Sequence, residues 1–237
     1  MYRIVRKEAL RPTVTLYEIE APLVAKKAQP GQFIILRVDE NGERIPITIN
    51  AYNPEKGTVT IIVQTVGATT VKLSHMKEGD CLADFVGPLG KPTETEGKKK
   101  VCVVGGGVGC AIAYPVLKKF HDCGAEVHAV VGFKNKDVVI LEDKFRAVSS
   151  VLKVCTDDGS YGQKGLVTEA LKQLLDEGNQ YDEVIAIGPL VMMKFVRTRP
   201  PSAVSSSSRS STFTASSMYG RATPSPSQSS CAVCPCA

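Results

Sequence analysis

The stretch Val101-Cys-Val-Val-Gly-Gly-Gly-Val-Gly109 decides the fold class of this chain. A short run of apolar, mostly β-branched residues is typical of a buried strand, and the glycines that follow allow a tight turn. An amphipathic pattern over residues 108–122 predicts a helix directly after them. A strand that enters a helix through glycines can bind phosphate, because the first N–H groups of the helix are free to donate. A turn that serves only strand–helix packing is the alternative interpretation.

The next predicted strand lacks a residue that an ordinary dinucleotide-binding fingerprint would have. That fingerprint places an acidic residue about 20 residues further on, at the end of the second strand. Here that strand ends Val130-Val131-Gly132-Phe133, without an acid. The sequence therefore predicts a nucleotide-docking scheme different from the standard one.

The region around this motif alternates strands with helices. Strands are expected at 101–104, 126–131, 151–156 and 183–187, and helices at 108–122, 166–177 and 190–196. Apolar strands that alternate with amphipathic helices predict βαβ units and a parallel sheet covered on both faces.

The region before the motif has a different pattern. Apolar and β-branched runs separated by turn clusters predict strands at 14–19, 33–38, 45–49, 58–66 and 81–86, with a short helix at 70–76. Short strands at this spacing favour a small antiparallel β-barrel. The polar segment 91–100 reads as a linker, so we expect a barrel domain at 1–97 and an α/β domain at 98–196.

The charge distribution argues against a nucleic-acid-binding protein. The 237 residues include 29 basic and 24 acidic ones, but four arginines and no acid follow Val196, which leaves 25 against 24 in the body of the chain. The serine- and proline-rich composition of 197–237 predicts a disordered tail. The uncharged stretch 101–117 is too short for a membrane span, and the first residues lack the apolar core of a signal peptide. We therefore expect a cytoplasmic protein.

Seven short motifs follow one another along residues 1–196. They are Pro30–Phe33, Arg44–Thr48, Val66–Thr70 before Lys72–Ser74, Gly87–Gly90, Gly105–Gly109, Thr156–Gly162 with Gly165–Thr168, and Gly188-Pro189 with Met192 and Met193. In this order they resemble the ferredoxin–NADP reductase superfamily. The similarity is strongest to its branch of electron-transfer subunits, which includes those of dihydroorotate dehydrogenase and of NADH-dependent ferredoxin–NADP reductase.

The resemblance implies an FAD-binding barrel followed by an NAD(P)-binding α/β domain. For FAD it implies the residues Arg44, Pro46, Ile47, Thr48, Ile62, Val63, Gln64, Gly67, Thr69 and Thr70. For NAD(H) or NADP(H) it implies Gly105, Gly106, Gly107, Gly109, Thr156, Asp157, Asp158, Gly159, Gly188, Pro189 and Met192. No catalytic side chain is expected, because the cofactors carry the hydride chemistry and the protein supplies position and electrostatics.

Several of these residues also have a simpler interpretation. The Arg44 guanidinium suits a pyrophosphate, but it could equally be a solvated charge at a strand edge. Thr48 could be an ordinary β-branched strand residue, and Thr69 and Thr70 could cap a helix. Asp157–Gly159 could be a plain turn.

The implied function is electron transfer between NAD(P)H and a partner oxidoreductase or ferredoxin, through FAD. The implied partner is a larger catalytic subunit, and a non-catalytic nucleotide-binding regulatory module on the same fold is the alternative. NAD and NADP remain equally open.

Members of the branch continue past the Gly-Pro turn with one more strand and a cysteine cluster that binds [2Fe–2S]. The abrupt change of composition here predicts that this cluster is lost, as after a shift of reading frame. Cys231, Cys234 and Cys236 are interpreted as adventitious, with a metal site as the alternative, because plant-type ligation needs four thiolates. Cys102, Cys110, Cys123 and Cys155 are expected in the core, and His75, His121 and His128 in surface or structural positions.

Overall fold

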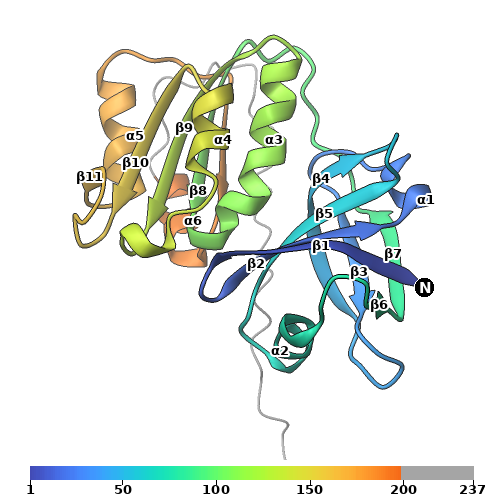
Figure 1. The fold of residues 1–237 in the computed structure, drawn as a ribbon. Coiled ribbons are helices and arrows are strands. Elements are labelled where there is room, and N and C mark those ends of the chain that lie inside the picture. The colour runs from blue at the N-terminus through green and yellow to red at the C-terminus, as the bar shows by residue number, and fades with distance from the viewer. Residues whose placement is uncertain (199–237) are drawn as a thin grey trace, which may run out of the picture.

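The computed structural model describes residues 1–198, which form two β-sheets with their helices (Figure 1). The first sheet is antiparallel and has the strand order β6-β1-β2-β5-β4-β3-β7. Its strands are β1 (Tyr2–Arg11), β2 (Val14–Glu20), β3 (Phe33–Arg37), β4 (Ile45–Asn53), β5 (Thr58–Gln64), β6 (Cys81–Leu82) and β7 (Asp84–Leu89). Its two edge strands, β6 and β7, are separated in the chain by Ala83 alone, so the sheet curls into a near-barrel.

The near-barrel is filled by one face of each strand. Fully buried side chains come from several strands and include Ile4, Ile34, Leu36, Ile61 and Phe85. The short helix α1 (Pro22–Ala25) and helix α2 (Ala68–His75) pack on this core, α2 through Leu73. The predicted antiparallel barrel is confirmed.

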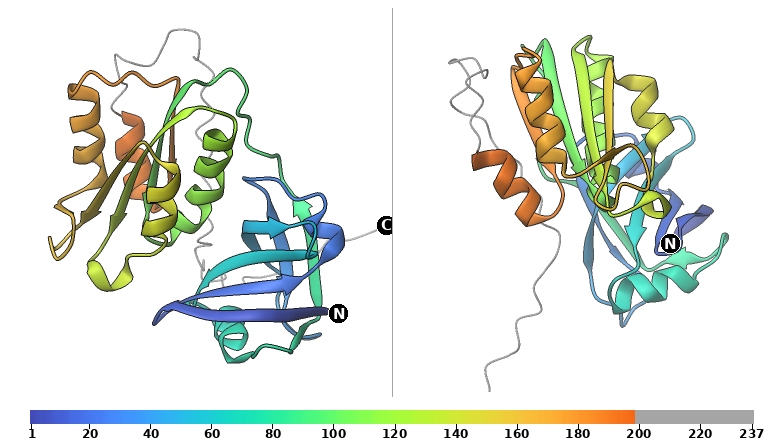
Figure 2. Two further views of the ribbon diagram at one scale, coloured as in Figure 1. Left: turned by 45° about the horizontal axis from the view of Figure 1, so that its top comes forward. Right: turned by 90° about the vertical axis from the view of Figure 1, so that its left-hand side faces the viewer.

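The second sheet is parallel and has the order β11-β10-β9-β8-β12. Its strands are β8 (Lys100–Gly106), β9 (Glu126–Phe133), β10 (Val151–Thr156), β11 (Gln163–Lys164) and β12 (Glu183–Ile187). Figure 2 shows helices on both of its faces. One face carries α3 (Cys110–Asp122) and α4 (Glu142–Val148), and the other carries α5 (Val167–Asp176) and α6 (Leu190–Thr198). The predicted α/β class is therefore also confirmed.

Within the described residues, no helix is long and apolar enough to span a membrane. The uncharged stretch 101–117 is divided between β8, the 3₁₀ turn η1 (Gly107–Gly109) and α3.

Several elements differ from the sequence prediction. Strand β1 was not predicted, because Ile4 is the only buried residue among its ten and the charged side chains hide any alternation. Helix α4 was missed because it is short and buries only Phe145. The single strand expected at 81–86 is two strands, since the chain passes from one edge of the near-barrel to the other at Ala83.

The two sheets share one hydrophobic core. Val14 and Leu16 of β2 and Ile62 of β5 point out of the barrel and belong to the same buried cluster as the inner side of α3. Arg11 adds a polar contact, because its Nε donates to the carbonyl of Val139 at 2.8 Å. The barrel is thus packed directly against the α3 face of the parallel sheet.

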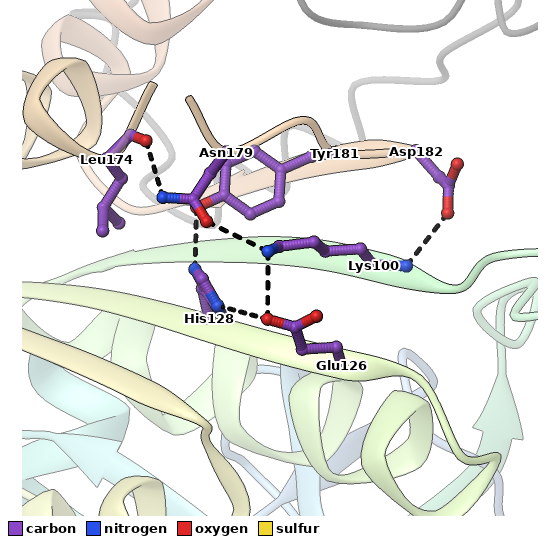
Figure 3. Close-up of polar contacts among 7 residues, drawn as sticks. All are labelled: Lys100, Glu126, His128, Leu174, Asn179, Tyr181 and Asp182. Carbon is purple, nitrogen blue, oxygen red and sulfur yellow. Dashed lines mark hydrogen bonds and ion pairs between the residues drawn. The ribbon is translucent and has the colours of Figure 1, made fainter. Parts of the chain in front are cut away.

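A network of polar side chains lies at the amino-terminal edge of the parallel sheet (Figure 3). The buried ring of His128 contacts the Tyr181 hydroxyl through Nδ1 at 2.8 Å and Glu126 Oε1 through Nε2 at 2.9 Å. Lys100 Nζ lies 3.0 Å from the same Glu126 oxygen and donates to Asn179 Oδ1. The Lys100 contact, followed by that of His128, lowers the pKa of Glu126. Burial raises the pKa of Tyr181, which keeps its hydroxyl protonated.

We expect Tyr181→Phe to lower the free energy of unfolding by about 1–3 kcal/mol, because it leaves a buried ring nitrogen without a partner. Chemical denaturation at pH 7 measures this change. Tyr2→Phe is the matched control, since the Tyr2 ring packs on Phe85 and is only partly buried. Equal stability of Tyr181→Phe and the unchanged protein would contradict the role of this contact.

Candidate functional site

From β8 the chain adds β9, β10 and β11 toward one edge of the parallel sheet, and then adds β12 on the other side of β8. Strand β8 is flanked by β9, which follows it in the chain, and by β12, the last strand of the sheet. The helices that follow β8 and β12, α3 and α6, leave toward opposite faces (Figure 2). In open α/β sheets, ligands bind in the crevice beyond the carboxyl ends of the strands at such a switch point.

Glycines let the two turns at this point touch backbone to backbone. A Cβ atom on Gly109 would lie 2.6 Å from the carbonyl oxygen of Ile187 and 2.9 Å from Gly188 Cα. One on Gly106 would lie 2.7 Å from Met192 Sδ and 3.0 Å from Pro189 Cδ. One on Gly105 would lie 2.8 Å from Cys110 Sγ. The structure thus brings the predicted set 105–109 together with Gly188, Pro189 and Met192.

Gly107 has a different environment from its neighbours. Its φ is +56°, in the left-handed region, and a Cβ there would meet no atom within 4 Å. The backbone of the turn is therefore open at Gly107 just before the first turn of α3, where N–H groups have no acceptor within the helix.

The third predicted segment follows β10 at the same edge. Thr156 is fully buried and holds the segment through Oγ1, which donates to the Tyr161 carbonyl at 2.6 Å and accepts from its N–H at 3.1 Å. Asp158 accepts from the hydroxyl and the N–H of Ser160, and these bonds, the hydroxyl's first, lower its pKa. Gly159 takes a φ of +77° in this tight loop.

The acid missing from the end of β9 has a replacement in space. Thr156 pairs with Phe133, and the N–H of Asp157 donates to the Phe133 carbonyl at 3.0 Å. Asp157 and Asp158 are exposed and therefore lie beside the position where the standard fingerprint has its carboxylate. The resemblance had already implied Asp157 and Asp158 as nucleotide ligands. Their position beside Phe133 could not be predicted, because the two segments are 24 residues apart in the chain and adjacent only in the sheet.

Arg44, the predicted pyrophosphate ligand, is positioned by a carboxylate that the sequence did not point to. Its Nη2 lies 2.9 Å from Asp84 Oδ2, which also lies 2.7 Å from Arg37 Nε. Its side chain is 60% exposed, whereas that of Arg37 is 20% exposed. Because two guanidiniums share one carboxylate, positive charge is left over on the exposed Arg44.

The segment 66–70 begins α2. The Thr70 hydroxyl accepts from the N–H groups of Val66 and Gly67 and donates to the Gly67 carbonyl at 2.8 Å. Thr69 is buried, while Gly67 is exposed and extended. Thr70 therefore closes the start of the helix, and the helix offers exposed backbone rather than free hydroxyls.

The remaining predicted residues lie on β4 and β5. Pro46 is exposed, Ile47 packs on the barrel core and Thr48 is buried on the opposite face of β4. On β5, Val63 points into the barrel core and Ile62 lies in the core shared with α3. Gln64 ends the strand and is half-buried.

Cysteines and histidines do not gather into a site in the part of the chain that the structure describes. Cys102, Cys110 and Cys155 are buried, as expected, but Cys123 is exposed because it terminates α3. Burial raises the pKa of the Cys155 thiol to about 11. No group of three or more potential metal ligands occurs among the described residues. Cys231, Cys234, Cys236 and the predicted disordered tail lie outside them.

One surface hollow of about 390 Å³ lies away from the switch point, next to β10 and α4. It is lined by Glu142, Arg146, Lys153, Tyr161 and neighbouring residues, and the Glu142 carboxylate is already bound to Arg146 and Tyr161. We place the candidate site at the switch point instead, since the backbone there is open and the strand order favours ligands there.

The architecture and this edge geometry define a ferredoxin-reductase-like protein. No family model matches the chain. A similar structure is that of NADH-dependent reduced ferredoxin–NADP oxidoreductase, with 44% identity and a TM-score of 0.77 over 82% of this chain and 70% of the other. Phthalate dioxygenase reductase shares the fold at 17% identity, with a TM-score of 0.67.

Relatives in sequence agree with this class. An uncharacterized Clostridium beijerinckii protein from the adh 3′ region is 51% identical over 203 residues, 82% of this chain and 69% of the relative. A Thermotoga maritima homologue of the dihydroorotate dehydrogenase B (NAD(+)) electron transfer subunit is 46% identical over 81% of this chain and 67% of the relative. The Streptococcus mutans electron transfer subunit is 36% identical over 81% and 74%. The chain therefore belongs to the family of dihydroorotate dehydrogenase B electron-transfer subunits.

Proposed function

We propose that this chain moves electrons from NADH to a partner oxidoreductase subunit or a ferredoxin through FAD. Residues 1–97 would form the FAD-binding domain and residues 98–196 the NAD(H)-binding domain. When bound, FAD would supply the chemistry that links a two-electron hydride donor to one-electron acceptors. The observation that carries the proposal is the crossing of Gly106 and Gly109 with Gly188 at the switch point, beside the barrel.

The residues of the barrel fit the polar end of FAD. Arg44 offers an exposed guanidinium that Asp84 holds in place and does not fully neutralise, because Arg37 shares that carboxylate. Exposed backbone at the start of α2 adds the partial positive charge of a helix N-terminus. Both features suit a pyrophosphate.

The carboxyl edge of the parallel sheet fits a nicotinamide nucleotide. The open backbone at Gly107 and the start of α3 would accept its pyrophosphate. Asp157 and Asp158 would accept hydrogen bonds from ribose hydroxyls and would repel a 2′-phosphate, which favours NAD(H) over NADP(H). The names of several relatives, which mention NAD(+), agree with this preference.

The partner is proposed from the family. Relatives described as electron transfer subunits imply a larger catalytic subunit that receives the electrons. The described residues contain no ligand set for a [2Fe–2S] cluster, and the three closely spaced cysteines lie beyond them. A regulatory module without electron transfer would bind nucleotide but fail to reduce a dye with NADH.

We expect Arg44→Ala to raise the dissociation constant for FAD about tenfold or more, since a charge-assisted contact to phosphate is lost. The folded state should survive, because Arg37 still pairs with Asp84. Flavin absorbance after gel filtration measures retention. Lys26→Ala removes an exposed cation next to α1 and is the control. Equal retention in both variants would rule out the role of Arg44.

We expect Gly107→Ala to raise the KM for NADH several-fold while bound FAD stays unchanged, because a methyl group would occupy the open backbone. Gly124→Ala is a matched control. Gly124 also has a positive φ, +84°, with no atom within 4 Å of an added Cβ, but it lies at the opposite end of α3. Both variants carry a similar strain of about 1–2 kcal/mol. An equal effect of both on KM would contradict the nucleotide site.

We expect kcat/KM for NADH to exceed that for NADPH by about tenfold or more, and Asp157→Asn to narrow the ratio. Steady-state dye reduction with each nucleotide measures it. Asp176→Asn makes the same charge change on the exposed end of α5 and should leave the ratio unchanged. A higher kcat/KM for NADPH would refute the specificity argument and leave the FAD proposal standing.

A further inference from the structure

We propose that Asn50 is a positioning residue that locks the flavin-binding barrel to the nucleotide-binding turn. Its side-chain Nδ2 donates to the carbonyl oxygen of Ala111 at 2.6 Å, and the residue is only 2% exposed. This inference rests on the proposed function, which supplies the two sites that the contact would hold in register. Ala111 is in the first turn of α3, directly after the Gly105–Gly109 turn.

Asn50 lies at a β-bulge on the outer face of β4, toward α3. In the pairing of β4 with β5, Ile49 lies opposite Ile61 and Ala51 lies opposite Thr60, so Asn50 is an extra residue without a partner. Since Ile47 and Ile49 pack on the barrel core, the alternation places Thr48 and Asn50 on the opposite face of β4. Asn50 therefore reaches out of the barrel, two residues after Thr48 of the proposed flavin segment, while Ile49 remains in the barrel core.

A proline inside α3 leaves one helix carbonyl without its usual donor, and Asn50 donates to that carbonyl. In an α-helix the carbonyl of residue 111 accepts from the N–H of residue 115, and residue 115 is a proline, which has no N–H. The Ala111 carbonyl is buried, so it needs another donor. Asn50 supplies that donor from the other domain (Figure 1 shows α3 beside the barrel).

The hydrogen bond to Ala111 orients the Asn50 amide. Apart from this bond, burial of the amide only costs free energy of folding. Only Nδ2 can donate to a carbonyl, so Oδ1 points the other way, and it is buried with no hydrogen-bond partner among the described residues. A leucine of similar volume would avoid that unsatisfied oxygen. The presence of an amide is therefore explained by the bond to Ala111, which ties β4 to the start of α3.

The hydrogen bond between Asn50 and Ala111 would fix the distance between the two bound cofactors. Thr48 and Asn50 belong to the strand that carries the proposed flavin contacts, and Ala111 belongs to the helix that starts at the proposed nucleotide turn. Hydride transfer depends steeply on the separation of donor and acceptor, so a loosened junction should slow it without abolishing binding.

The test is a double-mutant cycle with Asn50→Leu and Pro115→Ala. Asn50→Leu should leave FAD content unchanged and lower the limiting rate of flavin reduction by NADH about tenfold in stopped-flow measurements, with the half-saturating NADH concentration changed less than about twofold. Pro115→Ala gives α3 the missing N–H, which competes with Asn50 for the Ala111 carbonyl. Pro115→Ala alone should therefore also slow flavin reduction, and Asn50→Leu should then add less than about threefold in that background.

Hydrogen exchange separates this inference from the proposed function. Amides in the first turns of α3 should exchange faster in Asn50→Leu than in the unchanged protein, and Pro115→Ala should restore their protection, whether or not FAD binds. Equal rate losses in both backgrounds, or unchanged exchange in Asn50→Leu, would overturn the proposal. If Asn50→Leu alone is insoluble, the rate of flavin reduction in Pro115→Ala alone decides: a clearly lower rate with unchanged FAD content supports the proposal, and an unchanged rate refutes it.

Discussion

The contact on which the site depends is the close approach of two backbones at the carboxyl ends of β8 and β12. Gly109 lies against the Ile187 carbonyl and Gly188. A Cβ atom added to Gly188 would lie 3.1 Å from both the N and the Cα atoms of Gly106. No side chain larger than hydrogen fits there without moving the main chain. This constraint determines where α3 and α6 begin, because each helix starts from one of the two turns. The open backbone at Gly107 follows from the same crossing.

Much of this arrangement could be predicted from the sequence, because it depends on local patterns. The strands β10 and β12 begin and end where the apolar runs do, at 151–156 and 183–187. A turn at Gly107–Gly109 could be predicted because glycines follow a buried strand there, although Gly105 and Gly106 still belong to β8. The turn at Gly188 followed from the family resemblance. The motifs of the barrel gave its class for a similar reason, as alternation and turn residues act over short distances.

What could not be predicted depends on contacts between distant segments. Strand β1 is recognisable only by its partners, since its own sequence is charged and mostly exposed. Asp84 lies beside Arg44, 40 residues away in the chain, because β3 pairs with both β4 and β7. The carboxylate beside Phe133 comes from β10 and not from β9. In each case the residue type was visible, but its neighbour was set by the sheet order.

The junction between the two sheets combines apolar burial with directional polar contacts. Val14, Leu16 and Ile62 are apolar residues that a barrel alone would leave exposed, and they are buried because α3 covers them. A shared core resists relative movement of the two halves, since any opening would expose apolar surface. Such a core is not directional, however, and it leaves small shifts along the interface inexpensive. The short hydrogen bond between Asn50 and Ala111 is directional, as is the bond from Arg11 to Val139, and it joins β4 to the start of α3. Apolar burial therefore holds the halves together, while directional polar contacts across the junction favour one register.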